Sequence, residues 1–129
     1  MKIDEITEAV VGEAIRIHRE LGPGLLESVY EKVLSAGLTR KGLRVTTQVP
    51  VTIRYDGLVI DGAFRVDLLV EDTVVIEIKS VEKLTKLHAK QLLTYLRLMN
   101  QPVGLLLNFS GMTMKEGTRR LVNDYRPDS

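Results

Sequence analysis

Residues 66–80 read VDLLVEDTVVIEIKS, two mostly apolar runs on either side of an acidic turn. Both runs predict β-strands, in which successive side chains point to opposite faces. In the second run, Glu77 and Lys79 therefore share one face, and the opposite face is apolar. That apolar face consists of Val74, Ile76 and Ile78. Two explanations remain open for the charged face: an ordinary half-buried strand with one solvated side, or charges that belong to a functional site.

The turn between the two runs decides whether Asp67 joins Glu77. A two-residue turn at Glu71-Asp72 would pair Val70 with Thr73 and send Asp67 to the wrong face, because a slip of one residue flips every side chain. Glu and Asp are also poor residues for the positive φ angles of tight hairpins. We therefore predict a three-residue connection or a bulge, which places Asp67 roughly opposite Glu77.

The remaining segments predict one α/β domain over residues 1–129, in the order helix, helix, three antiparallel strands, helix, strand, helix. Asp4 is expected to cap the first helix and Gly22 to end it. Further helices are predicted at 25–40, 84–99 and 114–123, with a strand buried on both faces in QPVGLLLNFS at 101–110.

The dipeptide Asp56-Gly57 predicts a hairpin that pairs Tyr55 with Leu58 and Ile53 with Ile60. Alternation then gives this hairpin one apolar and one polar face. The apolar face collects Val45, Val49, Val51, Ile53, Tyr55, Leu58, Ile60, Phe64, Val66 and Leu68. The polar face collects Gln48, Thr52, Arg54, Asp61, Arg65 and Asp67.

The composition narrows the function classes. The 129 residues are 44% hydrophobic, enough for a single core. The absence of cysteine excludes disulfides, thiolate metal sites and cysteine nucleophiles, and favours a cytoplasmic protein. The N-terminus lacks the apolar region of a signal peptide, and no apolar run is long enough to span a membrane. The net charge of +1 leaves any nucleic-acid surface to local patches.

The helix predicted at 84–99 has a basic stripe and an apolar stripe. Lys83, Lys86, Lys90 and Arg97 form the basic stripe, and Leu84, Leu87, Leu92, Leu98 and Met99 form the apolar one. Basic runs are usually solvated, and we expect this here, with contact to a phosphate backbone as the alternative. His88, Gln91 and Tyr95 fall in the apolar stripe and suggest a polar pocket beneath the helix.

Three motifs occur in order: GLLESVY at 24–30, VDLLVEDTVVIEIKS at 66–80 and HAKQLLTYL at 88–96. Together they resemble the PD-(D/E)XK nuclease superfamily and, more narrowly, the GxxExxY family of small bacterial and archaeal proteins. Val66 stands where the superfamily's name has proline, a position without chemistry. The resemblance implies a restriction-endonuclease-like core: a mixed sheet of three antiparallel strands plus a further strand after a helix, with helices on both sides. It also implies that Gln91 and Tyr95 support the catalytic pocket.

Phosphodiester hydrolysis needs a nucleophilic water and neutralisation of charge on the phosphate. Asp67 and Glu77 are the expected ligands of Mg²⁺ or Mn²⁺, because carboxylate oxygens suit these hard ions. Lys79 would orient the water or stabilise the transition state. Glu27 would complete the metal site through water, although a first-turn Glu is often only a partner of the helix dipole. His88 could contact phosphate, support another residue or be a core histidine, and His18 is expected to be structural.

The predicted function is a metal-dependent nuclease of DNA, with RNA as an alternative substrate and a homodimer as an expected assembly for cutting two strands. The competing hypothesis is a nucleic-acid-binding or partner-docking module that has this fold but little or no catalysis. The combination of Asp67, Glu77 and Lys79 favours the enzyme, because a binding module has no need to bury like charges together.

Overall fold

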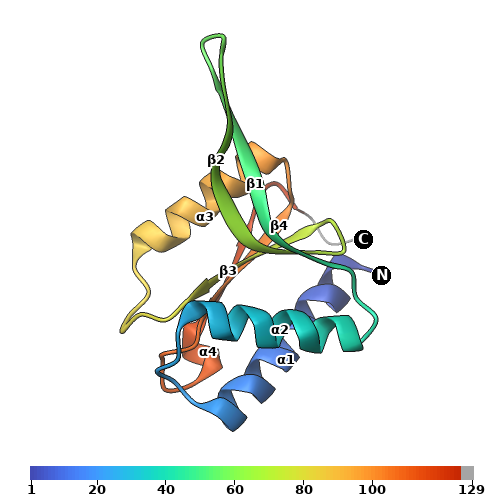
Figure 1. Cartoon of the computed structure of the whole chain (residues 1–129), viewed down its shortest axis with the longest axis vertical. Helices are drawn as coiled ribbons and strands as arrows, with labels where there is room; N and C mark the ends of the chain where they lie inside the picture. Colours follow the sequence, from blue (N-terminus) through green and yellow to red (C-terminus); the bar gives the residue numbers. More distant parts are fainter. Residues whose placement is uncertain (126–129) are drawn as a thin grey trace.

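The computed structural model describes residues 1–125, which form a five-stranded mixed sheet with helices on both faces (Figure 1). The last four residues of the predicted domain 1–129 lie outside the described residues. The elements are α1 (Ile3–Leu21), α2 (Glu27–Arg40), β1 (Val45–Tyr55), β2 (Leu58–Val70), β3 (Val74–Lys79), α3 (Lys86–Met99), β4 (Val103–Asn108), α4 (Met114–Gly117) and β5 (Thr118–Val122). The predicted α/β class is confirmed.

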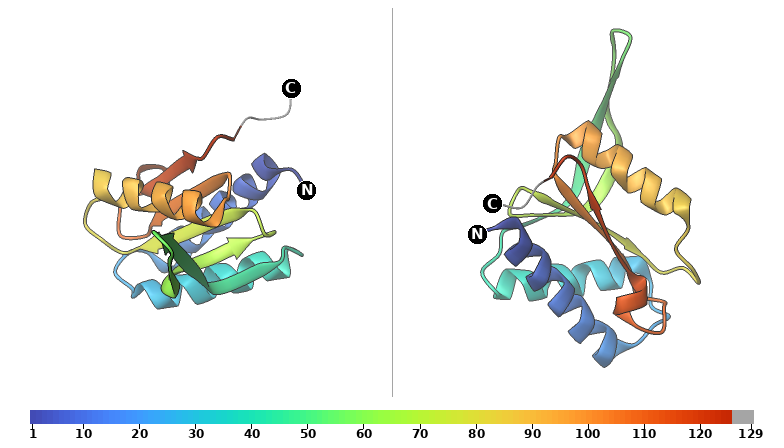
Figure 2. Two further views of the ribbon diagram at one scale, coloured as in Figure 1. Left: turned by 90° about the horizontal axis from the view of Figure 1, so that it is seen from above. Right: turned by 180° about the vertical axis from the view of Figure 1, so that it is seen from behind.

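The strand order is β1-β2-β3-β4-β5, and β3 and β4 are the parallel pair. Their parallel arrangement requires a crossover, which α3 provides. The helices α1 and α2 cover one face of the sheet and α3 covers the other (Figure 2). As predicted, Val74, Ile76 and Ile78 point into the core beneath α1 and α2, whereas Val75 points toward α3.

The helix α1 packs through the predicted apolar face of Ile6, Val10, Ala14 and Ile17. Its start differs from the prediction, because Lys2 occupies the N-cap position and Asp4 lies inside the first turn. There the Asp4 carboxylate accepts a hydrogen bond from Arg120 at 2.7 Å. Gly22 ends the helix as predicted, at a φ of 72°. His18, expected to be structural, contacts the backbone oxygen of Gly111 at 2.9 Å.

The C-terminal part of the fold differs from the prediction of a helix at 114–123. The helix α4 ends at Gly117, and Thr118–Val122 instead pairs antiparallel with β4. Two tertiary effects explain the difference. The added strand satisfies backbone groups along the edge of the buried β4. A side chain at position 117 would also collide with the Asn108 carbonyl, which Gly117 avoids.

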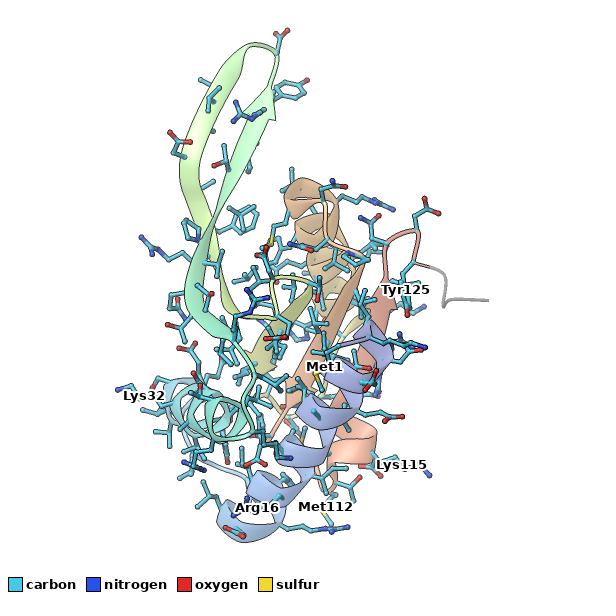
Figure 3. All side chains as sticks on the ribbon, turned by 90° about the vertical axis from the view of Figure 1, so that its right-hand side faces the viewer. Met1, Arg16, Lys32, Met112, Lys115 and Tyr125 are labelled. Atoms are coloured by element: carbon cyan, nitrogen blue, oxygen red, sulfur yellow. The ribbon has the colours of Figure 1, made fainter. Side chains whose placement is uncertain are left out.

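The strands β1 and β2 extend beyond the rest of the sheet as a hairpin arm (Figures 1 and 3). The predicted pairs Tyr55↔Leu58 and Ile53↔Ile60 are confirmed. The predicted faces are only partly correct, because Gln48 adopts a φ of 51° within β1 and interrupts the alternation. Val45 consequently packs on the side of α1 and α2, and Val49 packs on the side of α3.

None of the helices within residues 1–125 combines the length and apolar composition that a bilayer-spanning segment needs.

Candidate active site

The connection between β2 and β3 has three residues, Glu71–Thr73, and it pairs Val70 with Val74. The prediction of a three-residue connection is therefore confirmed. Its premise that acidic residues avoid positive φ was wrong, because Glu71 and Asp72 have φ angles of 51° and 56°. The Glu71 carboxylate accepts a 2.7 Å hydrogen bond from the backbone N–H of Arg44, a contact that compensates for this conformation.

Asp67 and Glu77 lie where β2 and β3 diverge, just past the last paired residues, Leu68↔Ile76. Their carboxylates replace the missing ladder bonds. Asp67 donates its backbone N–H to Glu77 Oε1 at 3.0 Å, and Ile78 donates its backbone N–H to Asp67 Oδ2 at 2.7 Å. The two carboxylates thus converge at the fork between the strands, in the register that the sequence predicts. We call this arrangement the carboxylate fork.

The carboxylate fork disfavours a negative charge on Glu77. Glu77 is 8% exposed. Its burial and the neighbouring Asp67 raise its pKa to about 7, although the Asp67 N–H and the charge of Lys79 oppose this shift. Glu27 adds a further, smaller increase to the pKa of Glu77. A carboxylate with this environment favours either a proton or a bound cation.

Lys79 is the last residue of β3 and is half-buried. Its backbone carbonyl accepts the N–H of Phe109 at 3.0 Å, which holds the strand end in place. The next residue, Ser80, donates its hydroxyl to the Leu25 carbonyl at 2.9 Å. The end of β3 is therefore tied directly to the loop that precedes Glu27.

Tyr30 fixes the same loop from the other side. Its hydroxyl donates to the Gly22 carbonyl and accepts the Leu25 N–H at 3.2 Å. Its ring is fully buried and stacks on Phe109, with 4.4 Å between the ring centroids. The tyrosine of the GLLESVY motif therefore has a structural role: it positions the loop from which α2, and with it Glu27, begins.

Glu27 is exposed and is the first residue of α2. Glu31, one helical turn later, was not among the predicted site residues. It accepts a 2.5 Å hydrogen bond from Gln48 Nε2. Partial burial and the neighbouring Asp67 raise the pKa of Glu31. The spacing of Glu27 and Glu31 could have revealed this residue, because side chains four residues apart lie on the same side of a helix.

Tyr95 approaches the carboxylate fork from α3. Its ring stacks on Phe64 with 4.1 Å between centroids. Burial raises the pKa of Tyr95, as do the charges of Glu77 and Asp67, and a hydrogen bond with Gln91 lowers it. This electrostatic coupling places Tyr95 beside the two carboxylates, with Gln91 as its partner.

The predicted polar pocket beneath α3 is only partly present. Gln91 is exposed, and Leu87, predicted to be apolar core, is 72% exposed. The helix buries Leu92, as predicted, together with Leu96, whereas Leu98 of the predicted apolar stripe is 39% exposed, so the contact face is narrower than the sequence pattern suggests. His88 is half-buried, and its Nδ1 accepts the Thr85 N–H at 3.0 Å. His88 therefore caps the start of α3.

The donor set fits a hard divalent ion held by two carboxylates. No three His, Cys, Asp or Glu side chains within residues 1–125 are arranged to hold a metal, so the predicted three-carboxylate set with Glu27 is not preformed. Mg²⁺ commonly uses one or two carboxylates and completes its shell with water and phosphate. Asp67 and Glu77 match this pattern, since neither forms an ion pair with Lys or Arg in the described part of the chain.

Space for a ligand adjoins the site. A cavity of about 560 Å³ lies between the start of α2 and the ends of β3 and β4, with Glu27, Ser80 and Ser110 among its lining residues. Neither this cavity nor a larger one of about 700 Å³, lined in part by Lys83 and Arg119, has Asp67 or Glu77 among its lining residues.

A family model described as the PD-(D/E)XK nuclease superfamily matches residues 4–121. Among solved structures, one described as "Crystal structure of SSO0001" is similar, with a TM-score of 0.46 and 24% sequence identity over 94% of this chain and 67% of that chain. No curated protein matches the chain at a significant level.

Proposed function

Because the chain belongs to the PD-(D/E)XK nuclease superfamily, we propose that it hydrolyses phosphodiester bonds in nucleic acid, with DNA as the substrate and Mg²⁺ or Mn²⁺ as the cofactor. The observation that carries this proposal is the carboxylate fork, in which the Glu77 carboxylate accepts the Asp67 backbone N–H and the Asp67 carboxylate accepts the Ile78 backbone N–H. Burying two like charges side by side destabilises a fold unless something binds them.

In this proposal, Asp67 and Glu77 would hold the ion, with Glu27 acting through water. The ion, when bound, supplies positive charge to the phosphate and makes water more acidic. Lys79 contributes the second positive charge, stabilising the charge that develops on the phosphate or orienting the attacking water. Gln91 and Tyr95 border the site from α3, where Gln91 would orient Lys79 or the phosphate. His88, as a helix cap, would support this border.

The alternative is a nucleic-acid-binding or docking module without catalysis. The docking-module hypothesis does not explain why the pKa of Glu77 is raised or why Asp67 lies beside it. The enzyme hypothesis explains both, because the electrostatic cost in the free protein becomes affinity for a cation.

The test is a cleavage assay with Mg²⁺ or Mn²⁺ on single-stranded, duplex and branched DNA and on the matching RNAs. We expect the wild-type protein to cleave DNA. Lys79→Ala should abolish cleavage while leaving metal and nucleic-acid binding largely intact, because its proposed role is in the transition state. Nucleic-acid binding without cleavage of any substrate would favour the docking module, and a fully active Lys79→Ala would remove Lys79 from the mechanism.

The finer assignments are proposals of the same kind. They comprise membership of the GxxExxY family, a single nuclease-like domain over residues 1–129, a homodimer and a cytoplasmic location. The homodimer has a candidate surface in the hairpin arm, where Tyr55, Leu58 and Ile60 are exposed.

A further inference from the structure

Gln48 has an unusual backbone for a residue in the middle of a strand. Its φ of 51° lies in the left-handed region, which favours glycine and asparagine and strains other residues. The register of β1 with β2 continues on both sides of it, through Thr47↔Leu68 and Val49↔Val66. The positive φ changes the face on which the flanking residues pack without shifting the register, and the Gln48 side chain at this point contacts Glu31 and Asp67.

The Gln48 amide lies between two carboxylates. Its Nε2 atom is 2.5 Å from Glu31 Oε1 and 3.4 Å from Asp67 Oδ1. A primary amide nitrogen carries two hydrogens, so it can donate one to each carboxylate. Glu31 and Asp67 would otherwise repel each other across this gap. The amide thus converts a repulsive pair into a bridged one.

This bridge gives Asp67 a second point of attachment. Its Oδ2 atom accepts the Ile78 N–H at 2.7 Å from the side of β3, and its Oδ1 atom faces Gln48 on the side of β1. Holding both oxygens fixes the orientation of the carboxylate. Each oxygen still has a lone pair available for a further ligand.

We propose that Gln48 is a positioning residue that holds the Asp67 carboxylate in the orientation for cation binding, with Glu31 anchoring the Gln48 amide. The inference rests on the nuclease function proposed above. Three replacements at position 48 would each lose a feature of this bridge: ionised glutamate has no hydrogens to donate, asparagine is one methylene shorter and alanine has no donor. Partners that orient a metal ligand typically change affinity or activity 10- to 100-fold when they are removed.

The decisive variant is Gln48→Gly, because glycine adopts positive φ without strain. If Gln48 served the fold alone, the glycine would relieve the strain of the positive φ and leave metal binding and cleavage unchanged. We expect Gln48→Gly to fold as stably as the wild type or more so. It should nevertheless lose about 10- to 100-fold in Mn²⁺ affinity by calorimetry and in kcat, with little change in KM for DNA. Asp56→Gly is the matched control, since Asp56 has a φ of 48° at the exposed hairpin turn and should alter neither quantity.

The anchor has its own pair of variants. Glu31→Gln keeps an oxygen that can accept from Gln48, whereas Glu31→Ala leaves the amide without its stronger partner. We expect Glu31→Ala to lower Mn²⁺ affinity and Glu31→Gln to restore most of it. Equal losses in both variants would show that the charge of Glu31, and not its hydrogen bond to Gln48, is what matters, and would overturn the anchoring role.

A measurement without metal or nucleic acid separates this inference from the proposed function. In Gln48→Gly, a loosened Asp67 should speed hydrogen exchange of the Ile78 amide about tenfold, relative to the Ile76 amide of the same strand. If the wild type binds Mn²⁺ and cleaves DNA, and Gln48→Gly does both equally well with unchanged Ile78 exchange, the positioning role is overturned. If the wild type does neither, the nuclease proposal fails, and the Ile78 exchange rate alone decides whether Gln48 holds Asp67.

Discussion

At the scale of single residues, Glu77 makes the stability of the metal-free protein depend on pH. Its pKa is about 7 in the folded protein and 4.5 in the unfolded reference, so the folded state binds the extra proton between these values. Stability from this group is therefore present below pH 4.5 and is lost as the pH rises toward 7. The free energy of unfolding therefore falls by about 3 kcal/mol over this range, because each unit of pKa difference corresponds to about 1.4 kcal/mol.

Glu77→Gln should remove this loss, since glutamine carries no charge at any pH. We expect the free energy of unfolding of the variant, minus that of the wild type, to increase by about 3 kcal/mol between pH 4 and pH 8 without divalent ions. Urea denaturation at the two pH values measures the difference. A difference that does not change with pH would mean that Glu77 titrates normally in the folded protein.

Tyr30 provides a second prediction at this scale. Tyr30→Phe removes both hydrogen bonds of a buried hydroxyl, to Gly22 and from Leu25, without creating a large cavity. We expect the free energy of unfolding to fall by about 1–3 kcal/mol, because the freed backbone groups lose their partner.

The same substitution at Tyr55, which is 76% exposed, is the control and should change stability by less than about 0.5 kcal/mol. Similar values for the two variants would indicate that the Tyr30 hydroxyl does not hold the loop.

At the scale of elements, α3 presents two different surfaces. Tyr95 faces the carboxylate fork, whereas Lys86, Lys90 and Arg97 are exposed on the side away from the buried Leu92 and Leu96. None of the three basic residues forms an ion pair with a described residue. This arrangement is consistent with the expectation that they are solvated.

Neutralising Lys86, Lys90 and Arg97 together should therefore leave the salt dependence of DNA binding nearly unchanged. The slope of log K against log salt is negative, and each phosphate contact that is lost reduces its magnitude by about 0.9. Binding titrations at several salt concentrations measure this slope. A decrease of two or more units would show that the stripe follows the phosphate backbone.

The elements also show which structural features were accessible from sequence. The Asp56-Gly57 turn follows from local turn chemistry, so it could be predicted. The three-residue connection between β2 and β3 was also predicted, although its premise about the φ angles of Glu71 and Asp72 was wrong. The strand Thr118–Val122 could not be predicted, because its pairing is decided by the open edge of β4. The sequence places Gln48 on the same polar face as Asp67, but its positive φ and its contact with Glu31 of α2 could not be predicted, because they involve residues distant in the sequence.

At the scale of the whole molecule, the fold places the residues of the proposed site between the sheet and the helices on its two faces. Asp67 and Glu77 lie where β2 and β3 diverge. The sheet around them is covered by α1 and α2 on one face and by α3 on the other (Figure 2). Contacts among Ser80, Leu25 and Tyr30 couple the start of α2 to the end of β3. The site therefore depends on correct packing of both faces of the sheet.

The most direct measurement is calorimetric titration of the purified protein with Mn²⁺, with Asp67→Ala in parallel. The account predicts one binding event for the wild type, because Glu77 is buried beside the half-buried Asp67 and neither forms an ion pair within residues 1–125. It predicts no detectable event for the variant. Circular dichroism should confirm that the variant is folded. Equal Mn²⁺ binding by the wild type and a folded Asp67→Ala would contradict the claim that the carboxylate fork is the metal site.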